Sequence, residues 1–307
     1  MHNRRAFLQS LVVAGASAAL PSRASAESKS LLVFTKSSGF EHEVVKQIDG
    51  KPSIVENVIK AICKKHGYDV HCTKDGGIFS SEELAKFTAI FFFTTGDLTQ
   101  VGTDKNPSMS ADGKQKLLAA ISGGTGFVGS HAAADTFHTQ PDPQDLSNRY
   151  IAHGDKSDPY LLMLGGEFIV HGSTPRLQAA NLVIEDPKFP GLEGVRSPIE
   201  FTEEWYSLKD FAPDLHVIAS LDTKGMTGEC YNRPAYPMTW ARMYGAGRVF
   251  YTAIGDRPEN WNNPFFLNLL DGGLRFAMRD ANAELSGNLN TAAPGSAVIP
   301  PKNKSSR

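Results

Sequence analysis

The sequence has little cysteine and no excess of basic charge. These two shortages argue against a disulfide-rich protein and against a nucleic-acid-binding protein. Cys63, Cys72 and Cys230 are the only cysteines in 307 residues, too few for a dense disulfide framework. One pair could form or all three could be free thiols, and the spacing does not decide between these states. The chain has 31 lysines and arginines against 33 aspartates and glutamates. It has no basic stripe, so nucleic-acid binding is not expected.

The sequence also has no apolar run long enough to span a bilayer, which takes roughly 20 residues. The stretch from Leu8 to Leu20 is shorter and diluted by Ala, Gly and Ser. It follows the pair Arg4-Arg5 and precedes the small-residue triplet Ala24-Ser25-Ala26. This order predicts a twin-arginine signal peptide over residues 1–26 and a periplasmic or secreted mature protein without a membrane span.

Short apolar segments alternate with helix-like segments in the first half of the chain. Strands are expected at Leu31–Phe34, Tyr68–Cys72, Ala89–Phe93 and Gly126–Ser130, with helices at Pro52–Lys65, Ser80–Lys86 and Ala111–Ser122. Most of these strands are apolar on both faces, which is typical of a parallel sheet covered by helices. The sequence therefore predicts an α/β fold with a doubly wound, mainly parallel sheet. No G-x-G-x-x-G turn follows the first strand, so a soluble dinucleotide mechanism is not expected.

The second half is less regular. Strands are expected at Leu177–Glu185, Leu215–Leu221 and Arg248–Ile254, a helix at Asn263–Ala277, and a long loop with a small helix over 135–172. No linker divides the chain, so residues 27–285 are expected to form one domain. The polar segment 286–307 has little to bury and is expected to be flexible or loosely docked.

Polar side chains gather in the loops that should follow the strands, where ligands bind in such sheets. The candidate site residues are Phe40, Glu41 and His42 after the first strand, Ser130, His131, Asp135 and Phe137 after the strand at 126–130, His171 in a Gly-rich segment, and Glu204, Trp205 and Tyr206. The turn at Ser130-His131 has neither a cysteine nor the G-x-S-x-G spacing of a nucleophile elbow. His131 is therefore the principal candidate for proton transfer, with His42, Asp135, His171 and Glu204 as further catalytic candidates.

Three interpretations of the histidines stay open. His42, His131 and His171 could bind zinc or a similar divalent ion, with Glu204 or Asp135 adding an oxygen ligand. They could line a polar pocket for a sugar or an acid without a metal, or they could only hydrogen-bond loop backbone. Glu204 beside Trp205 and Tyr206 favours a sugar, because carboxylates bind hydroxyls and aromatic faces pack against sugar C–H groups.

Several of these segments resemble the ThuA-like family, which is associated with trehalose utilisation. The matching segments are Ser38–His42 (SGFEH), Gly126–Phe137 (GFVGSHAAADTF), Gly165–His171 (GGEFIVH), Glu203–Tyr206 (EEWY), Pro237–Trp240 (PMTW) and Gly247–Gly255 (GRVFYTAIG). The resemblance implies a fold similar to class I glutamine amidotransferases, flavodoxin-like, without their catalytic cysteine. It also implies sugar catabolism around 3-keto-glycosides, which a partner sugar 3-dehydrogenase would make.

The chain departs from the family pattern at two positions. Asp256 follows Gly255 where the family often has a histidine, and Glu41 stands where members often carry arginine. Asp256 is thus expected to contribute a carboxylate to the substrate site, and Glu41 to change its charge preference.

The leading hypothesis is an exported enzyme that acts on a glycoside by histidine and carboxylate acid–base chemistry. The alternatives are a periplasmic sugar-binding protein without catalysis and a metal-dependent hydrolase.

Overall fold

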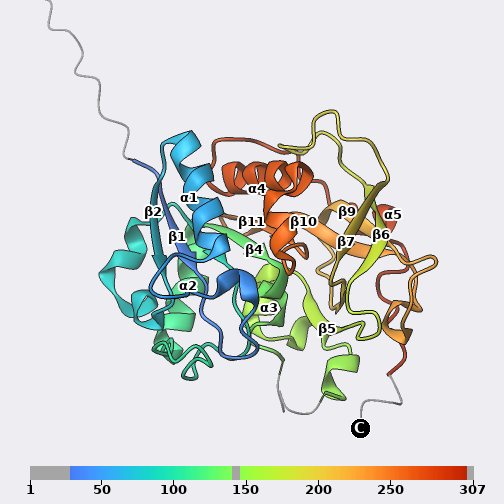
Figure 1. The fold of residues 1–307 in the computed structure, drawn as a ribbon, viewed down its shortest axis with the longest axis horizontal. Coiled ribbons are helices and arrows are strands. Elements are labelled where there is room, and N and C mark those ends of the chain that lie inside the picture. The colour runs from blue at the N-terminus through green and yellow to red at the C-terminus, as the bar shows by residue number, and fades with distance from the viewer. Residues whose placement is uncertain (1–27, 140–145, 303–307) are drawn as a thin grey trace, which may run out of the picture.

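The computed structural model describes residues 28–139 and 146–302, so the predicted signal peptide lies outside the described residues. A nine-stranded sheet has the order β2-β1-β3-β4-β11-β10-β9-β6-β7, and β5 and β8 form a separate two-stranded sheet (Figure 1). The strands are β1 Ser30–Phe34, β2 Asp69–Thr73, β3 Ala89–Phe92, β4 Gly126–Ser130, β5 Glu167–His171, β6 Gln178–Ile184, β7 Ile199–Glu203, β8 Tyr206–Lys209, β9 His216–Asp222, β10 Tyr236–Tyr244 and β11 Gly247–Thr252. The helices are α1 Ile54–His66, α2 Ala111–Gly123, α3 Pro159–Leu164, α4 Pro264–Ala277 and α5 Leu289–Ala292.

The strands β2, β1, β3, β4 and β11 run parallel and have helices on both faces. The crossover from β1 to β2 leads one way along the sheet and that from β3 to β4 leads the other, so right-handed connections place α1 and α2 on opposite faces. Lys65 and His66 of α1 pair with Asp271 of α4 on one face, and Lys114 of α2 pairs with Asp158, the residue before α3, on the other. The predicted doubly wound α/β fold is confirmed.

Local sequence explains why α1 forms where it does. The Ser53 side chain accepts a hydrogen bond from the Glu56 amide, and the Glu56 carboxylate accepts one from the Ser53 amide, a capping box that satisfies two free donors. Val55 and Ile59 are fully buried on the face toward the sheet. Gly67, at φ 71°, ends the helix in the left-handed region that favours glycine.

The other four strands of the large sheet, β10, β9, β6 and β7, extend it in antiparallel fashion. The sequence predicts strands close to β6, β9 and β11 but not β5, β7, β8 or β10. The hairpin between β10 and β11 turns at Gly245, at φ 58°. This extension supplies Glu204 to the site described below, since that residue directly follows β7.

The segment after Ser286, expected to be flexible or loosely docked, makes several contacts with the domain in its described part, up to residue 302. The Asn288 side chain accepts a hydrogen bond from the Val217 amide of β9 at 2.6 Å, and Leu289 and Ala293 are buried. Arg233 donates to the Ser296 carbonyl at 2.8 Å. A few anchors are therefore enough to dock a segment whose overall composition is polar.

The three cysteines are free thiols. Cys63 is buried in α1, Cys72 is half-buried in β2, and Cys230 is buried in the chain between β9 and β10. Among the residues that the structure describes, no helix is both long and apolar enough to cross a bilayer.

The loops that leave the parallel strands lie side by side at the carboxyl end of the sheet. Ser37, after β1, bridges to Thr95, after β3, and Gly96 bridges to Thr136, after β4. Connections from β1 and β3 depart in opposite directions, so this is the topological switch point, where doubly wound sheets bind ligands.

Candidate active site

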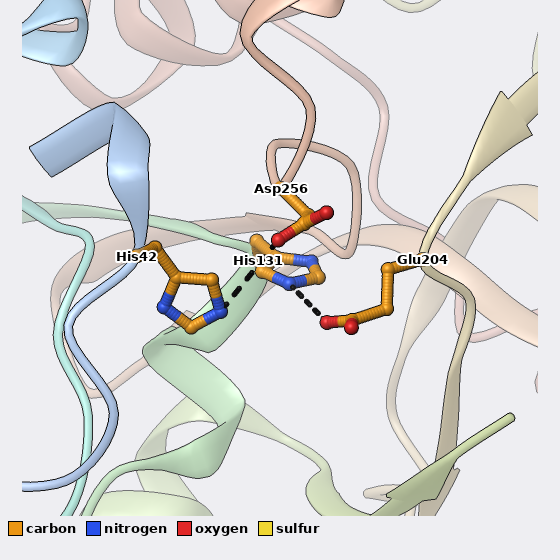
Figure 2. Close-up of side chains that lie close together, drawn as sticks. All are labelled: His42, His131, Glu204 and Asp256. Atoms are coloured by element: carbon orange, nitrogen blue, oxygen red, sulfur yellow. Dashed lines mark ion pairs between the residues drawn. The ribbon is translucent and has the colours of Figure 1, made fainter. Parts of the chain in front are cut away.

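Four buried side chains converge beyond the carboxyl ends of the parallel strands (Figure 2). His42 follows β1, His131 follows β4, Asp256 follows β11, and Glu204 lies between β7 and β8. One ligand atom from each lies within 4.8 Å of the others. The Nε2 atom of His131 is 3.4 Å from Oε2 of Glu204, and Nε2 of His42 is 4.0 Å from Oδ1 of Asp256. Residues 42, 131 and 204, predicted as catalytic, therefore meet residue 256, predicted as substrate-binding.

The end of β4 holds the His131 ring in one orientation. The residue has φ 45°, an uncommon conformation for a side chain of this size, and it is fully buried. Its Nδ1 lies 2.9 Å from the Ala253 carbonyl, which can only accept, so Nδ1 carries a proton. The ring packs against Tyr206 at a tilt of 37°, with 4.0 Å between centroids. Its Nε2 faces Glu204 and has no hydrogen-bond partner within residues 28–139 and 146–302.

Arg176 joins the two carboxylates, and sequence reasoning missed it. Its Nη1 donates to Oε1 of Glu204 at 2.8 Å and to Oδ2 of Asp256 at 2.7 Å. The residue lies two positions before β6, whose antiparallel register pairs Gln178 with Glu203. That pairing brings Arg176 beside Glu204, so a correct prediction of β7 and its partner would have found it.

The cluster fixes the charge of its members. Burial, and next the nearby His131, lower the pKa of His42 to about 3, so this ring is neutral at pH 7. Burial opposes a charge on His131, but the carboxylates, Glu204 first, outweigh burial and raise its pKa to about 9. Burial likewise opposes a charge on Glu204, yet His131 and the other cationic neighbours lower its pKa to about 2. At pH 7 the pair is an imidazolium and a carboxylate.

Glu203 ties the segment that carries Asp256 to the end of β7. Its carboxylate accepts hydrogen bonds from the Gly255 amide at 2.9 Å, the Asn260 side chain at 2.8 Å and the Glu204 amide at 2.8 Å. Burial raises its pKa against these hydrogen bonds and His131. Glu203 is not among the predicted site residues, although it opens the family-like segment Glu203–Tyr206, and its hydrogen bonds place Asp256 and Glu204 side by side.

A cavity of about 780 Å³ opens above the cluster. Its lining includes Phe40, Glu41, His42, Asp135, Phe168, His171, Arg176, Glu204, Tyr206 and Asp256. His131 is not among the lining residues, because it lies beneath them. The predicted principal proton-transfer group is therefore one layer below the surface that a substrate would touch.

His171 lies at the edge of this cavity with part of its ring exposed. Its Nδ1 is 2.9 Å from the Gly172 carbonyl and 3.5 Å from Oε1 of Glu204. Both oxygens accept hydrogen bonds, so Nδ1 carries a proton and Nε2 is the nitrogen that can exchange one. The His171 ring can therefore accept a proton from a substrate, and the Glu204 carboxylate helps to fix its orientation.

Comparison with known families identifies the chain. The family model ThuA, described as trehalose utilisation, matches residues 30–277. The chain belongs to the ThuA family. This membership confirms the resemblance of its motifs and supports a carbohydrate-related role.

Solved structures of ThuA-like proteins share the fold. A ThuA-like protein from Bacteroides uniformis ATCC 8492 superposes with a TM-score of 0.58 at 17% identity, over 84% of this chain and 95% of the other. One from Parabacteroides merdae ATCC 43184 gives 0.51 at 17% identity, over 87% of this chain and 96% of the other. Identities this low show the fold alone. A search of curated proteins finds no match.

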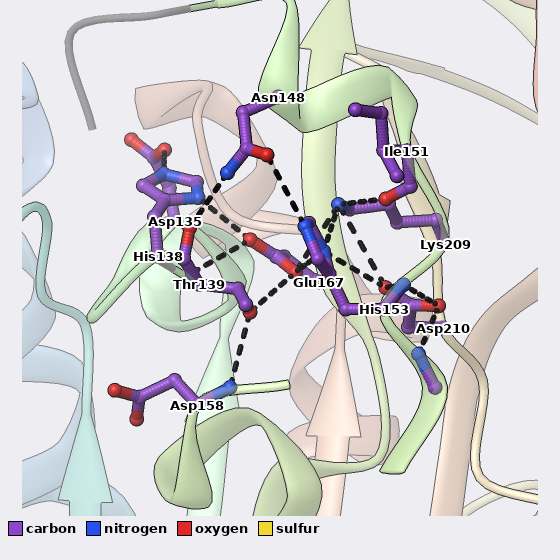
Figure 3. Close-up of polar contacts among 11 residues, drawn as sticks. Asp135, His138, Thr139, Asn148, Ile151, His153, Asp158, Glu167, Lys209 and Asp210 are labelled. Atoms are coloured by element: carbon purple, nitrogen blue, oxygen red, sulfur yellow. Dashed lines mark hydrogen bonds and ion pairs between the residues drawn. The ribbon is translucent and has the colours of Figure 1, made fainter. Parts of the chain in front are cut away.

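A second polar network in this ThuA-family chain holds Asp135 at the cavity wall (Figure 3). The Nε2 of His138 is 2.5 Å from Oδ1 of Asp135, and its Nδ1 is 3.2 Å from Oε1 of Glu167. Burial opposes a charge on His138, but both carboxylates outweigh it and raise the pKa. His138 was not predicted, although it follows the matching motif by one residue.

The remaining residues predicted for substrate binding separate into two groups. Phe40 is 70% exposed at the cavity edge, and Tyr206 lines the cavity beneath it. Glu41 also lines it, but Lys74 lies 3.1 Å away, so its carboxylate is paired. Phe137 lines a neighbouring cavity of about 820 Å³, which shares Phe40 and Asp135 with the first.

Two predicted substrate contacts belong to the core instead. The Ser130 hydroxyl is fully buried and donates to the Ile254 carbonyl at 2.8 Å. Trp205 is fully buried, and its indole N–H donates to the Gln178 carbonyl at 2.8 Å. Alternation along the chain explains the error for Trp205: Glu204 and Tyr206 line the cavity while the residue between them points the other way.

Proposed function

We propose that this ThuA-family protein is an exported enzyme that acts on a glycoside, of the 3-keto type, by acid–base chemistry in the cavity above His42, Glu204 and Asp256. The observation that carries the proposal is His171, an imidazole with Nδ1 held by backbone and Glu204 while its ring opens into the cavity. A neutral imidazole so oriented is the usual general base near neutral pH.

The absence of a nucleophile at the β4 turn favours a reaction that needs only a base and a group that stabilises negative charge. The Ser130 hydroxyl is committed to the Ile254 carbonyl, and no cysteine lines the described part of the cavity. A ketone at C3 of a sugar acidifies the hydrogen on C2, and the glycosidic oxygen on C1 is then in position to leave. Proton abstraction next to a carbonyl therefore fits this site better than direct displacement.

The proposed step balances with two groups. His171 takes the C2 proton, and negative charge collects on the C3 oxygen. Arg176, which lines the cavity with a guanidinium that has further N–H groups, stabilises that charge. The C1–O bond breaks, a C1–C2 double bond forms, and His171 returns the proton to the leaving oxygen. The products are an unsaturated 3-keto sugar and a free alcohol, with no change in overall redox state.

His131 acts through Glu204 in this scheme. Its ring is fully buried and 3.4 Å from Oε2 of that carboxylate, so it fixes the charge and orientation of Glu204, which in turn faces His171. The Phe40 ring, 70% exposed, offers a face for the sugar C–H groups, and the buried rings of Phe168 and Tyr206 contribute to the cavity lining.

The test incubates the protein with trehalose and with its 3-keto derivative and separates the products by chromatography. The conjugated ketone also gives an ultraviolet signal. We expect turnover of the oxidised sugar, and a loss of about 10²- to 10⁴-fold in kcat for His171→Gln. His71→Gln, an exposed histidine on β2, serves as the matched control and should keep full activity. Binding without turnover of either sugar would instead assign a sugar-binding protein.

Export and a partner dehydrogenase belong to the same proposal. The leader motif around Arg4-Arg5 supports twin-arginine export, and a 3-keto substrate requires an enzyme that oxidises the sugar at C3. N-terminal sequencing of secreted protein should begin near Glu27. Secreted material that still begins at Met1 would refute the cleavage.

A further inference from the structure

We propose that His42, His131, Glu204 and Asp256 bind a divalent transition-metal ion at the floor of the cavity. The inference goes beyond the proposed function, since such a site would exist whatever the substrate. The four side chains come from four separate segments of the chain, and their ligand atoms all lie within 4.8 Å of one another (Figure 2). Binding at 2.0–2.2 Å from each atom needs only a small contraction of this set.

A buried nitrogen that makes no hydrogen bond within the described residues is the first independent sign of a ligand. The Nε2 of His131 is buried, points at Oε2 of Glu204, and has no hydrogen-bond partner in the part of the chain that the structure describes. Its Nδ1 proton is directed at the Ala253 carbonyl at 2.9 Å. Histidine ligands typically donate their second ring N–H to a carbonyl in this way, and a metal would take the place of the proton on the other nitrogen.

The two carboxylates are oriented in the same manner. Arg176 binds Oε1 of Glu204 and Oδ2 of Asp256, and these are not the oxygens that face His131 and His42. The opposite oxygens, Oε2 and Oδ1, are the ones that face His131 and His42. Each carboxylate therefore uses one oxygen for a fixed partner and presents the other to the centre of the cluster.

The donor set indicates which ions fit. Two imidazole nitrogens and two carboxylate oxygens suit zinc, and manganese or iron next. Magnesium and calcium prefer oxygen ligands alone. Three of the four residues line the cavity while His131 lies beneath, so the ion would keep a side open toward a substrate.

A second cluster of similar composition already contains a cationic side chain among its ligand atoms. His153, Glu167 and Asp210 also bring ligand atoms within 4.8 Å of one another (Figure 3). The Lys209 ammonium already lies 3.0 Å from Nδ1 of His153, 3.4 Å from Oε2 of Glu167 and 3.7 Å from Oδ2 of Asp210. This lysine lies within 3.7 Å of all three side chains, histidine included, whereas Arg176 binds only the two carboxylates of the first cluster, so we assign no metal to the second cluster and use it as a matched control.

The test measures metal binding apart from activity. The full chain is treated with a chelator, dialysed, and titrated with zinc by calorimetry, with elemental analysis of the dialysed complex. Cobalt titration adds a visible absorption spectrum that reports on the ligands. We expect one zinc per chain, and weakening on the order of 100-fold or more in His42→Gln and in Asp256→Asn. Two variants are used so that the test still stands if one of them does not fold, and circular dichroism shows whether each variant is folded.

The control variant His153→Gln should bind zinc as the natural chain does. Stoichiometry below one zinc per folded chain would overturn the proposal. Binding that survives in both His42→Gln and Asp256→Asn would overturn it as well, and so would binding that only His153→Gln removes. Activity of the chelated protein on 3-keto sugars is a separate result: it bears on the proposed function and leaves the zinc titration unaffected.

Discussion

Breaking the buried pair of His131 and Glu204 should destabilise the chelator-treated protein by about 3 kcal/mol at pH 7. Glu204→Gln keeps the shape of the side chain and removes its charge. His131 is then a buried imidazole that has lost the carboxylate 3.4 Å away, with side chains only 0% and 5% exposed. Two charges at this distance attract by about 5 kcal/mol at an effective dielectric constant of about 20, before desolvation is subtracted.

The pKa of His131 gives a second measure of the same energy. An increase from 6.5 to about 9 corresponds to about 3 kcal/mol of preference for the charged ring. Loss of one partner from a buried ion pair typically costs about 3–5 kcal/mol, so the two figures agree.

The assay is chemical denaturation of the natural chain, Glu204→Gln, His131→Gln and the double variant. Each single variant loses the attraction between the two side chains, which the double variant loses only once, so the double variant should cost less than the two singles together by at least about 2 kcal/mol. Free energies of unfolding that add within about 0.5 kcal/mol would refute the pairing.

The pH dependence follows from the same shifts. The pKa of His131 is raised in the folded protein, so its stabilisation is complete below pH 6.5 and is lost as the pH rises through about 9. The pKa of Glu204 is lowered, so its stabilisation is present above pH 4.5 and lost as the pH falls through about 2. The penalty of Glu204→Gln should be largest between pH 4.5 and 6.5 and should shrink above pH 9. A penalty that is constant with pH would contradict the assigned charges.

Three further predictions concern the fold. Lys209→Met removes a buried cation that lies 3.4 Å from Glu167 and 3.7 Å from Asp210 and should lower the free energy of unfolding by about 3–5 kcal/mol in a denaturant titration; an unchanged value would contradict the role of the lysine. A methyl group at Gly272 would lie 1.7 Å from a backbone oxygen, so Gly272→Ala should cost about 1–3 kcal/mol or more, whereas Gly123→Ala meets nothing within 4 Å and should be neutral; equal melting temperatures would refute this. Removal of residues 287–307 should lower the melting temperature because Leu289 is buried against the domain, and a melt identical to that of the full chain would mean that the segment does not stabilise it.

The parallel half of the sheet could be predicted from the sequence because its signals are local. The strand at Leu31–Phe34 is apolar throughout, and Ser53, Glu56 and Gly67 mark the ends of the following helix. The rule that ligands bind beyond parallel strands then selected the loops that carry His42 and His131, which the structure brings together.

The antiparallel half could not be predicted in the same way. Strands β7 and β8 are short and have polar residues in them, and their partners are set by long-range pairing. Arg176 reaches the site only because β6 pairs with β7, and Trp205 is buried only because the strand end places Glu204 and Tyr206 on the cavity side. Asp256 was expected at the substrate site from the family pattern, and the structure places it beside His42.

A crystal structure of the protein soaked with a 3-keto disaccharide tests the central claim most directly. We predict that the sugar occupies the cavity lined by His171, Arg176 and Tyr206, with C2 next to Nε2 of His171 and the C3 oxygen toward Arg176. A sugar bound only in the neighbouring cavity at Phe137, or no sugar at saturating concentration, would contradict the proposed active site.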